Sequence, residues 1–583
     1  MKKTKIICTV GPSTDKSGIL EAMLEAGMNV ARFNFSHGTH EDHAARIALV
    51  RKASENTGKS VALLLDTKGP EMRIGKFAEG KVQLIEGQKF VLTTRDIAGS
   101  DSEVSVNHKL LPSEVSSGDK ILLSDGLIGL NVEYVEGQDI ITTVLNSGQI
   151  SNLKRVAVPG VAVNLPFLSE QDIADILFGA KNDMDFVAAS FVQRAADVLA
   201  IRRVLEDVGV TMDIIAKIEN AEGVHNIDEI LKVVDGIMVA RGDLGVEIPT
   251  EEVPIVQKML IDKCNKAGKP VITATQMLES MMANPRPTRA EASDIANAIM
   301  DGTDVIMLSG ETASGQYPLE AVEMMAKIAI RTEESLSYSS LLLSQGISLQ
   351  RSSTDAISHA TVQVAHELNA AAIVTSTERG YTPRMVSKYR PQAPIVAITP
   401  HLKTIRRMQM LWGVQPVHGV QSQNSDDMVA NSVDSALKSG AIKEGDLIVI
   451  TAGVPVGMSG TTNMLRVYVV GDVLLKGIGI GQKVVIGKVC AADSAKELKD
   501  KFKPGDILVV NAVDDETANF AAKAAAIIAE EGGLTSHAAI VGISYGIPVI
   551  VGAAGATKRL NDGMIVTVDA ARGSVYQGEI NAR

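Results

Sequence analysis

The sequence predicts an α/β protein whose first part is a (β/α)8 barrel, followed by two further α/β units. Three observations support this prediction. Eight short β-like runs recur, each ending in polar residues, with helical segments between them. The alternation breaks once, over residues 70–166, where short strands and turns replace it. Finally, 45% of the residues are hydrophobic but only 3% are aromatic, which is typical of a core of Ala, Val, Ile and Leu.

The barrel is predicted from the alternation itself. Most segments between the β-like runs have amphipathic helical spacing, as in GILEAMLEAG and VPIVQKMLIDKCNKAG. Strand and helix alternating eight times is typical of a parallel TIM barrel, and we assign residues 1–69 and 167–335 to it. The predicted strands are residues 5–12, 29–38, 61–70, 184–192, 212–220, 235–245, 269–278 and 303–313.

Residues 70–166 are predicted to form an inserted β-barrel lid domain. The stretches KFVLTTRDIAGSD and KILLSDGLIGLNVEYVEGQD consist of short strands separated by turn signals. This all-β insertion falls between the third strand and the third helix, at the C-terminal end of the barrel. An insertion at that end is placed to act as a lid over the reactive groups.

Two more units follow the barrel. A serine-rich connector after Thr332 leads into an α/β unit, residues 336–472, with a helix from Thr354, strands at AAIVTST, PIVAIT, DLIVITAG and MLRVYVV, and a helix through MVSKYRP. Residues 473–583 form the last unit, with strands at KVVIGKV, DILVVN, IPVIVG and MIVTVDA. A long Ala-rich helix is predicted between the second and third of these strands.

Composition narrows the class of protein. The formal charge of −12 argues against non-specific binding to nucleic acid or to an anionic membrane. The three cysteines, Cys8, Cys264 and Cys490, are too few and too far apart for a disulfide scaffold. Neither a signal peptide nor an apolar stretch long enough to span a bilayer is evident. We therefore expect a cytoplasmic protein with no nucleic-acid or membrane partner.

Charged residues at the strand ends point to a divalent metal site. Glu219 and Asp243 follow adjacent predicted strands, and Mg²⁺ is commonly held by one or two carboxylates with waters and substrate oxygens. Lys217 lies two residues before Glu219, on the same side of the strand, and suits a transferring phosphoryl group. The plainer alternative is that Lys217 only neutralises the two acids. Arg32 and Arg73 add guanidinium groups for phosphate oxygens.

A second set of strand-end residues is rich in oxygen but carries a single formal charge. Such a set suits a monovalent cation, although Ser36 and Asp66 can equally be ordinary turn or cap residues. On chemistry alone both interpretations stay open. The members of the set are Asn34, Ser36, Asp66 and Thr67.

Longer motifs resemble one family. The strings TKIICTVGPS, MNVARFNFSHG, LLLDTKGPEMR, AKIEN, VARGDLGVEIP, ATQMLESM, PRPTRAEASDIANAIMDGTD and MLSGETASGQYP are similar to those of the pyruvate kinases, in that family's order and spacing, over residues 1 to about 470. The resemblance implies transfer of a phosphoryl group from phosphoenolpyruvate to ADP, giving pyruvate and ATP. It also implies a homotetramer that is activated by a phosphorylated small molecule.

The resemblance assigns roles residue by residue. It implies that Glu219 and Asp243 hold Mg²⁺ or Mn²⁺, and that Lys217 stabilises the phosphoryl group in transfer. Thr275 contacts the substrate carboxylate and, with Ser309, belongs to a proton relay to the enolate. The substrate-binding positions that match are Arg32, Lys217, Gly242, Asp243 and Thr275; the nucleotide-binding ones are Asn34, His37, Arg73 and Lys154; and the K⁺ ligands are Asn34, Ser36, Asp66 and Thr67.

Two positions of the first 160 residues are informative within the family. Its lid usually has Lys-Gly-Val-Asn-Leu-Pro-Gly, with the lysine near the nucleotide phosphates, whereas this chain has Lys154-Arg155-Val156-Ala157-Val158-Pro159-Gly160. Only the lysine and part of the pattern match. Glu71 follows Lys-Gly-Pro, as in the members that resemble the potassium-requiring group. A requirement for K⁺ is therefore predicted.

The second unit resembles the family's effector domain. Its loops TERGYT and ITAGVPVGMSGTT can cradle a phosphate through N–H and hydroxyl groups, with Thr377, Arg379, Gly380 and Thr382 as the candidate residues. The family usually has Ser-Gly where this chain has Arg379-Gly380, so the activator stays open between a sugar phosphate and AMP. The alternative is a structural domain without a ligand.

The last unit resembles the swivelling mobile domain of enzymes that use phosphoenolpyruvate. His537, in Thr-Ser-His, matches the histidine that carries a phosphoryl group there, but Gly542-Ile543 replace the usual Ala-Arg. We favour a structural or regulatory tail. The alternative is a His537 phosphotransferase that uses phosphoenolpyruvate. A non-catalytic scaffold is disfavoured because Lys217, Glu219 and their partners at the strand ends are all present.

Replacing Lys217 by Met should lower the turnover of phosphoenolpyruvate and ADP by a factor on the order of 10³ or more, because the charge beside the phosphoryl group is lost. Steady-state kinetics of pyruvate formation would measure the effect. Turnover close to that of the unaltered protein would remove Lys217 from the mechanism.

Overall fold

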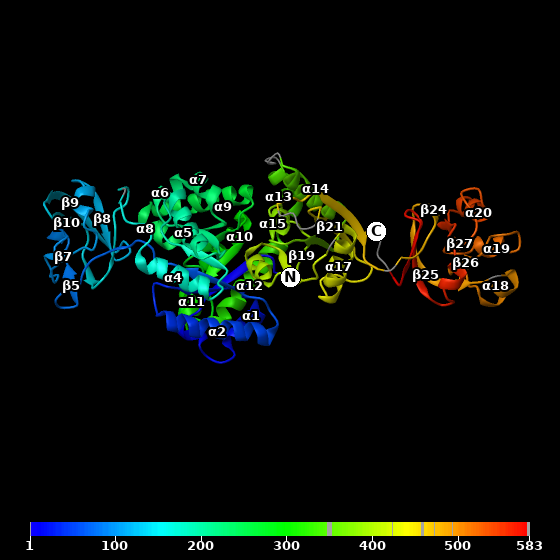
Figure 1. The fold of residues 1–583 in the computed structure, drawn as a ribbon, viewed down its shortest axis with the longest axis horizontal. Helices are drawn as coiled ribbons and strands as arrows, with labels where there is room; N and C mark the ends of the chain where they lie inside the picture. Colours follow the sequence, from blue (N-terminus) through cyan, green and yellow to red (C-terminus); the bar gives the residue numbers. More distant parts are fainter. Residues whose placement is uncertain are drawn as a thin grey trace. The chain divides into compact units, whose positions relative to one another are not determined.

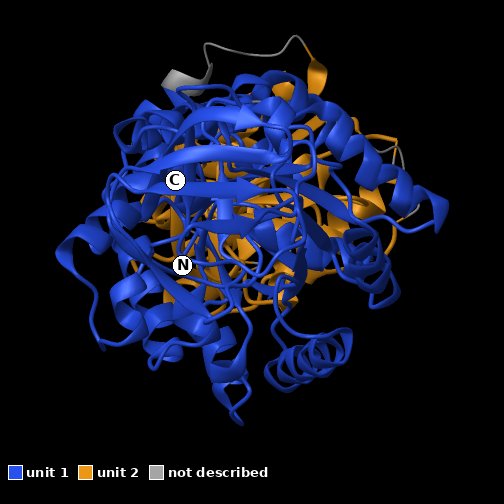
Figure 2. Ribbon diagram, turned by 90° about the vertical axis from the view of Figure 1, so that its left-hand side faces the viewer, with its two compact units in different colours: residues 1–348, 383–390, 401–416 blue, residues 349–382, 391–400, 417–583 orange. Residues whose placement is uncertain are grey.

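The computed structural model describes residues 2–161, 163–346, 352–422, 424–455, 460–471, 473–492 and 494–579. Contacts divide the chain into two compact units, coloured separately in Figure 2. Unit 1 comprises residues 1–348, 383–390 and 401–416, and unit 2 comprises residues 349–382, 391–400 and 417–583.

Unit 1 contains the predicted barrel, and all eight predicted strands are confirmed. They are parallel and close in the order β1-β17-β16-β15-β14-β13-β3-β2. Every strand is buried along nearly its whole length, as expected where helices cover the outer face of a parallel sheet. The strands are β1 (Lys5–Thr9), β2 (Val30–Asn34), β3 (Ala62–Asp66), β13 (Phe186–Ala189), β14 (Asp213–Ile218), β15 (Gly236–Ala240), β16 (Val271–Ala274) and β17 (Val305–Leu308).

Helices surround the barrel, as the green and blue ribbons of Figure 1 show. Local sequence fixes their starts: Thr39, Ser169 and Thr288 each accept a backbone N–H of the first turn. The principal helices are α1 (Ile19–Ala26), α2 (His40–Thr57), α4 (Glu170–Lys181), α5 (Ala195–Asp207), α7 (Ile227–Val233), α9 (Val253–Ala267), α10 (Arg289–Asp301) and α12 (Pro318–Glu334). Short helices directly follow three strands: α6 (Ala221–His225), α8 (Arg241–Glu247) and α11 (Gly310–Ala313).

The insertion forms the all-β lid, seen as blue to cyan strands in Figure 1. A seven-stranded sheet has the order β4-β12-β8-β9-β10-β6-β7, and β11 pairs with β5. The first and last strands of the insertion in chain order, β4 and β12, are neighbours in this sheet, with Arg73 opposite Arg155. The elements are β4 (Met72–Arg73), β5 (Lys81–Leu84), β6 (Lys89–Thr93), β7 (Glu103–Ser105), α3 (Leu111–Glu114), β8 (Lys120–Leu123), β9 (Ile128–Glu136), β10 (Asp139–Val144), β11 (Gly148–Ser151) and β12 (Arg155–Ala157).

Beyond the barrel, the predicted serine-rich connector is partly helical, as α13 (Tyr338–Gly346), and its residues 347–351 lie outside the described part of the chain. A five-stranded sheet follows in the order β20-β19-β18-β21-β22. Strand β20 and helices α16 and α17 were not predicted from the sequence. The elements are α14 (Ser353–Glu367), β18 (Ala372–Ser376), α15 (Tyr381–Ser387), β19 (Ile395–Thr399), α16 (Leu402–Arg407), β20 (Val414–His418), α17 (Ser425–Lys438), β21 (Leu447–Ala452) and β22 (Met464–Val469).

The last sheet has eight strands, in the order β23-β30-β29-β25-β26-β27-β28-β24. The long Ala-rich helix is wrong: the segment forms the four-residue helix α19 and then strand β27, whose residues are all buried between β26 and β28. The elements are β23 (Val473–Lys476), β24 (Ile478–Ile480), β25 (Val484–Ala491), α18 (Ala495–Lys501), β26 (Ile507–Val510), α19 (Ala518–Ala521), β27 (Ala526–Ala529), α20 (His537–Tyr545), β28 (Val549–Val551), α21 (Ala556–Arg559), β29 (Ile565–Asp569) and β30 (Ser574–Gln577).

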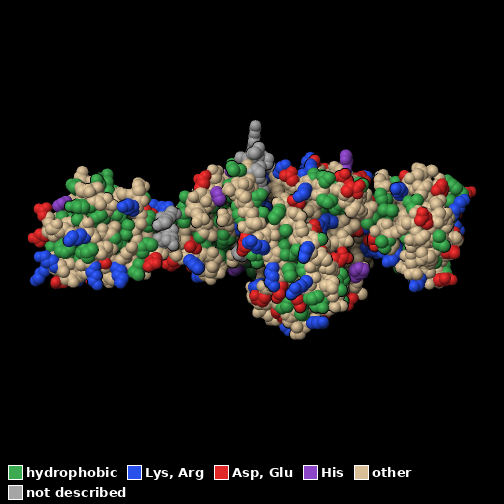
Figure 3. Space-filling model, turned by 180° about the vertical axis from the view of Figure 1, so that it is seen from behind, with side chains coloured by type: hydrophobic (Ala, Val, Ile, Leu, Met, Phe, Trp, Pro, Cys, Tyr) green, Lys and Arg blue, Asp and Glu red, His purple; other side chains and the backbone are tan. Residues whose placement is uncertain are grey.

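The surface carries charges of both signs. On the face seen in Figure 3, Lys and Arg side chains are interspersed with Asp and Glu. Among the described residues, none of the helices combines the length and apolarity needed to cross a membrane.

A buried lysine lies at the start of β1. Lys5 is 4% exposed, and its ammonium donates a hydrogen bond of 2.6 Å to the Val414 carbonyl. Burial lowers the pKa of Lys5 to about 8, although the nearby Glu333 carboxylate opposes the shift. The unfolded chain therefore binds more protons than the folded one between this value and the ordinary value of 10.5.

Because of that difference, the folded state should gain stability relative to Lys5→Met as the pH rises from about 8 to 10.5, by at most about 3 kcal/mol. Thermal unfolding of both proteins at pH 7 and pH 9.5 would measure it. The melting temperature of the unaltered protein, relative to that of the variant, should be higher at pH 9.5 than at pH 7. A constant or reversed difference would contradict the shift.

Candidate active site

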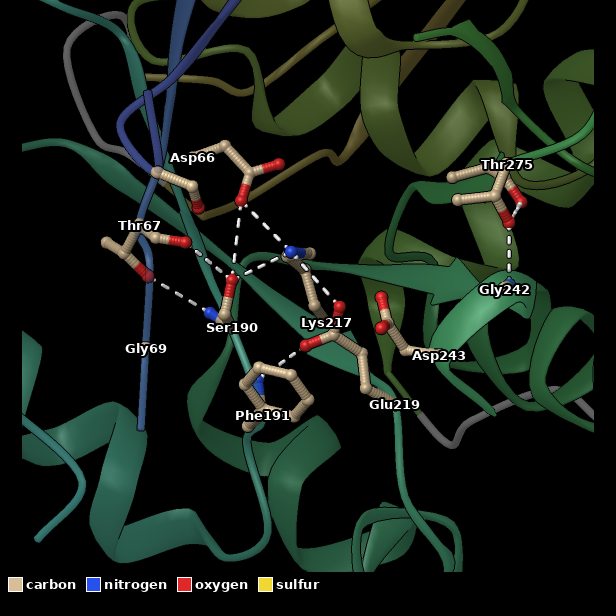
Figure 4. A network of polar contacts seen from close by, with 12 residues as sticks. Asp66, Thr67, Gly69, Ser190, Phe191, Lys217, Glu219, Gly242, Asp243 and Thr275 are labelled. Atoms are coloured by element: carbon tan, nitrogen blue, oxygen red, sulfur yellow. Dashed lines mark hydrogen bonds and ion pairs between the residues drawn. The ribbon is translucent and has the colours of Figure 1, made fainter. Parts of the chain in front are cut away.

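Two of the predicted strand-end residues, Asp66 and Glu219, meet at the ammonium group of Lys217 (Figure 4). Lys217 is near the end of β14, and its Nζ donates to Asp66 Oδ1 at 3.0 Å and to Ser190 Oγ at 2.7 Å. It also lies 3.1 Å from Glu219 Oε1. Burial alone would lower the pKa of Lys217, but the carboxylates of Asp66 and Glu219 outweigh it and raise the pKa above its usual value. Lys217 is therefore a fixed cation.

Asp66 links Lys217 to Arg32. Its Oδ2 accepts a hydrogen bond of 2.6 Å from Arg32 Nε, and Arg32 Nη1 donates to Thr9 Oγ1 at 2.9 Å. Asp66 is 1% exposed, so burial favours its neutral form, yet Arg32 and Lys217 hold its pKa below the ordinary value. The carboxylate thus fixes two cations of the predicted set side by side.

Ser190 is a site residue that the sequence analysis missed. It follows β13 and is 2% exposed, and its hydroxyl donates to the Thr67 carbonyl at 2.6 Å while accepting from Lys217. Its backbone N–H donates to Thr67 Oγ1 at 3.1 Å. Gly69 permits this approach: its φ is +72°, and a Cβ there would lie 2.7 Å from the Ser190 Cβ. Ser190 lies within the predicted strand 184–192, whereas the observed strand ends at Ala189, and the polar residue in this apolar run was the available signal.

Glu219 and Asp243 lie close together, as Figure 4 shows. Glu219 Oε2 accepts the Phe191 N–H at 2.6 Å, while Glu219 Oε1, although buried, has no hydrogen-bond partner among the described residues. Burial raises the pKa of Glu219 to about 7, with Asp243 adding to the rise and Lys217 opposing it.

These carboxylates fit a divalent ion. Glu219 Oε1 is buried and makes no hydrogen bond among the described residues, only the 3.1 Å ion pair with Lys217, and the side chain of Asp243 is 36% exposed, although Arg155 contacts its Oδ1. Within the described ranges, no group of three or more His, Cys, Asp or Glu is arranged to hold a metal. A divalent ion here would therefore take its remaining ligands from water and substrate oxygens.

The loop after β15 is fixed by Arg241. Arg241 donates to Asp294 at 2.7 Å and to the Thr275 carbonyl at 2.7 Å. The Gly242 N–H donates to Thr275 Oγ1 at 2.8 Å. Thr275 and Gln276 have φ angles of +69° and +54°. A positive φ is an outlier for a β-branched residue such as Thr275. Strain of this kind is concentrated at functional sites.

The remaining predicted residues of the barrel also lie at strand ends. Ser309 follows β17, and its N–H donates to Glu311 Oε2 at 2.7 Å. Asn34 is opposite Asp66 in the pairing of β2 with β3, and its Oδ1 accepts the Ser36 N–H at 3.1 Å. Ser36 and His37 are exposed.

Three lid residues face this site or flank it. Arg73 donates twice to Glu71 Oε2, at 2.9 and 2.6 Å, and once to the Leu153 carbonyl. Lys154 is half-buried. Arg155, which the sequence analysis noted only as a departure from the family pattern, contacts Asp243 directly through Nη1.

The candidate effector residues and His537 belong to unit 2. Thr377 Oγ1 accepts the Gly380 N–H at 3.0 Å, and the hydroxyls of Thr382 and Thr462 are 2.9 Å apart. Arg379 is exposed. Residues 456–459 of the second loop lie outside the described residues. His537 is exposed at the start of α20, whose first turn is capped by Ser536.

Comparison with known proteins identifies the family. The model of the pyruvate kinase barrel domain matches residues 1–322, more than half of the chain, and that of the pyruvate kinase alpha/beta domain matches residues 355–468. The chain belongs to the pyruvate kinase family. A third model, the mobile domain of PEP-utilising enzymes, matches residues 502–573.

Full-length relatives agree. The pyruvate kinase of Geobacillus stearothermophilus is 55% identical over 580 residues, and that of Bacillus licheniformis is 53% identical over 581, each comparison covering 99% of both chains. A solved pyruvate kinase from Cryptosporidium parvum is 40% identical with a TM-score of 0.76, covering 80% of this chain and 96% of that one. The relatives whose match includes the C-terminal domain are thus named pyruvate kinase, which is a transferase. The alternative function, a phosphotransferase that uses His537, is not favoured.

Replacing Ser190 by Ala should lower turnover about tenfold, because a buried hydrogen bond that holds the Lys217 ammonium is lost. Steady-state kinetics of the variant would measure it. Ser54→Ala, which removes a half-buried serine hydroxyl on α2 that donates to the Lys59 carbonyl, is the matched control and should leave turnover unaltered. Equal turnover in both variants would show that Lys217 does not depend on Ser190 for its position.

Proposed function

We propose that this chain transfers the phosphoryl group of phosphoenolpyruvate to ADP, giving pyruvate and ATP, as in the last step of glycolysis. The observation that supports this most directly is the fixed ammonium of Lys217, held by Asp66 beside Glu219 at the carboxyl ends of the barrel strands. A buried cation beside an open pair of carboxylates suits a reaction in which negative charge moves between oxygens.

In this proposal the chain's own cations bind and orient the phosphoryl group. Lys217 and Arg32 face it, and the bond from phosphorus to the enol oxygen breaks as a bond to a terminal oxygen of ADP forms. The enolate that remains takes one proton at its methylene carbon. Thr275 and Ser309, which directly follow the adjacent strands β16 and β17, are proposed to hold the substrate carboxylate and to pass that proton.

Two metal ions are proposed as cofactors. Glu219 and Asp243 would hold Mg²⁺ or Mn²⁺, which supplies positive charge to the oxygens of the substrate. K⁺ is proposed to bind oxygens at the ends of β2 and β3, where Asn34 and Asp66 lie opposite each other. The proposed ligands are Asn34, Ser36, Asp66 and Thr67.

The nucleotide is proposed to bind between the barrel and the lid, against Asn34, His37, Arg73 and Lys154. An effector phosphate is proposed at Thr377, Arg379, Gly380 and Thr382, a loop with an exposed guanidinium, in which the Gly380 N–H donates to Thr377 Oγ1 and the hydroxyls of Thr382 and Thr462 bond each other. We also propose a homotetramer in the cytoplasm, with the C-terminal domain as a structural or regulatory tail rather than a phosphocarrier.

The test is pyruvate formation from phosphoenolpyruvate and ADP with Mg²⁺, with and without K⁺. Activity that requires K⁺ is expected, because residue 71 is a glutamate. A lysine at this position would supply a positive charge in place of K⁺. His537→Ala should keep its basal turnover, since His537 lies in the C-terminal unit. Activity independent of K⁺ would contradict the cation assignment alone. No activity, even with sugar phosphates or AMP, would contradict the proposed reaction.

A further inference from the structure

Arg155 enters the proposed metal site from the lid. It begins β12, at a position where the family pattern has glycine, and only 8% of it is exposed. Its Nη1 contacts Asp243 Oδ1, and its Nη2 lies 3.7 Å from Glu247 Oε1. The guanidinium carbon is 4.6 Å from the centroid of the Phe191 ring, so the group is stacked as well as paired.

Arg155 is held by several negative charges. Burial disfavours its charged form, but Asp243, Glu219, Glu247 and Glu71 outweigh that effect and raise its pKa. A guanidinium and a divalent ion need the same lone pairs of Asp243, and both neutralise the same charge. The two cations cannot occupy that carboxylate oxygen together.

The structure also provides room for Arg155 to leave Asp243. A cavity of about 250 Å³ lies between the lid and the barrel, and Arg155 forms part of its wall. Four acidic residues line the same cavity: Glu71, Asp197, Glu222 and Glu247. A guanidinium released from Asp243 can therefore turn towards other negative charges without a large movement of the strand that carries it.

We propose that Arg155 is a metal gate: its guanidinium competes with the divalent ion for Asp243, so metal enters the site only as Arg155 moves off this carboxylate. The inference rests on the proposed role of Glu219 and Asp243 as metal ligands. It makes Arg155 a residue that sets metal affinity through the lid. A glycine at this position cannot perform that function.

The test is Mn²⁺ binding to the substrate-free protein, measured from the electron paramagnetic resonance of free Mn²⁺. Arg155→Ala should bind Mn²⁺ about tenfold more tightly than the unaltered protein, since the competing cation is gone. Arg95→Ala removes the same charge from an exposed lid arginine that pairs with Glu103 and Asp139, and it should leave the affinity unaltered.

Guanidinium chloride at millimolar concentration should restore the competition. It should weaken Mn²⁺ binding to Arg155→Ala more than NaCl of equal ionic strength does, and it should have little effect on the unaltered protein. If Arg155→Ala does not fold, Arg155→Lys serves instead, with about threefold tighter binding expected because one ammonium replaces a two-armed donor.

The outcomes distinguish a failure of the Arg155 gate from a failure of the proposed metal site. Glu219→Gln should abolish Mn²⁺ binding. Lost binding in Glu219→Gln together with equal or weaker affinity in Arg155→Ala, compared with the unaltered protein, would overturn the gate and leave the metal site standing. Binding that persists in Glu219→Gln would overturn the proposed metal site, and the gate with it.

Discussion

The ion cluster formed by Asp66, Lys217 and Glu219 is the constraint on which the rest of the site depends. Two carboxylates and one ammonium are removed from water where three strands of the barrel end. Such burial is expensive unless each charge is paired in good geometry. The barrel supplies that geometry, because parallel strands in fixed register present their last residues at one rim. Arg32 adds a hydrogen bond to Asp66, and Ser190 accepts one from Lys217, at a close approach that Gly69 permits.

Much of the architecture was predictable because the apolar runs that form the strands and the polar residues of the site are adjacent in the sequence. Each barrel strand is a short apolar run followed by a polar residue, so the strands and their functional ends could be found together. Lys217 and Glu219 could be placed on one side of β14 from the alternation of a strand alone. Ser190 was missed because the apolar run 184–192 continues past it, so the end of the strand at Ala189 was not evident from the sequence. Only its three-dimensional neighbours give it a role.

Other parts were not predictable for physical reasons. The segment around Ile527 and Ile528 is rich in alanine, which favours a helix, but tertiary packing between β26 and β28 makes it a strand. Strand β20 is only partly buried and has a proline in it, so its pattern is weak. The role of Arg155 depends on contact between residues 88 positions apart, which no local pattern contains.

The lid begins and ends at adjacent strands, β4 and β12, with Arg73 opposite Arg155. Since the two attachment points are already together in the barrel, inserting about a hundred residues between them adds little to the entropy cost of closing that loop. The lid also has its own apolar core, in which Phe90 and Leu130 are fully buried. Domain insertion of this kind lets the lid vary in sequence, or differ in size among relatives, while the barrel keeps its register and its rim of reactive groups.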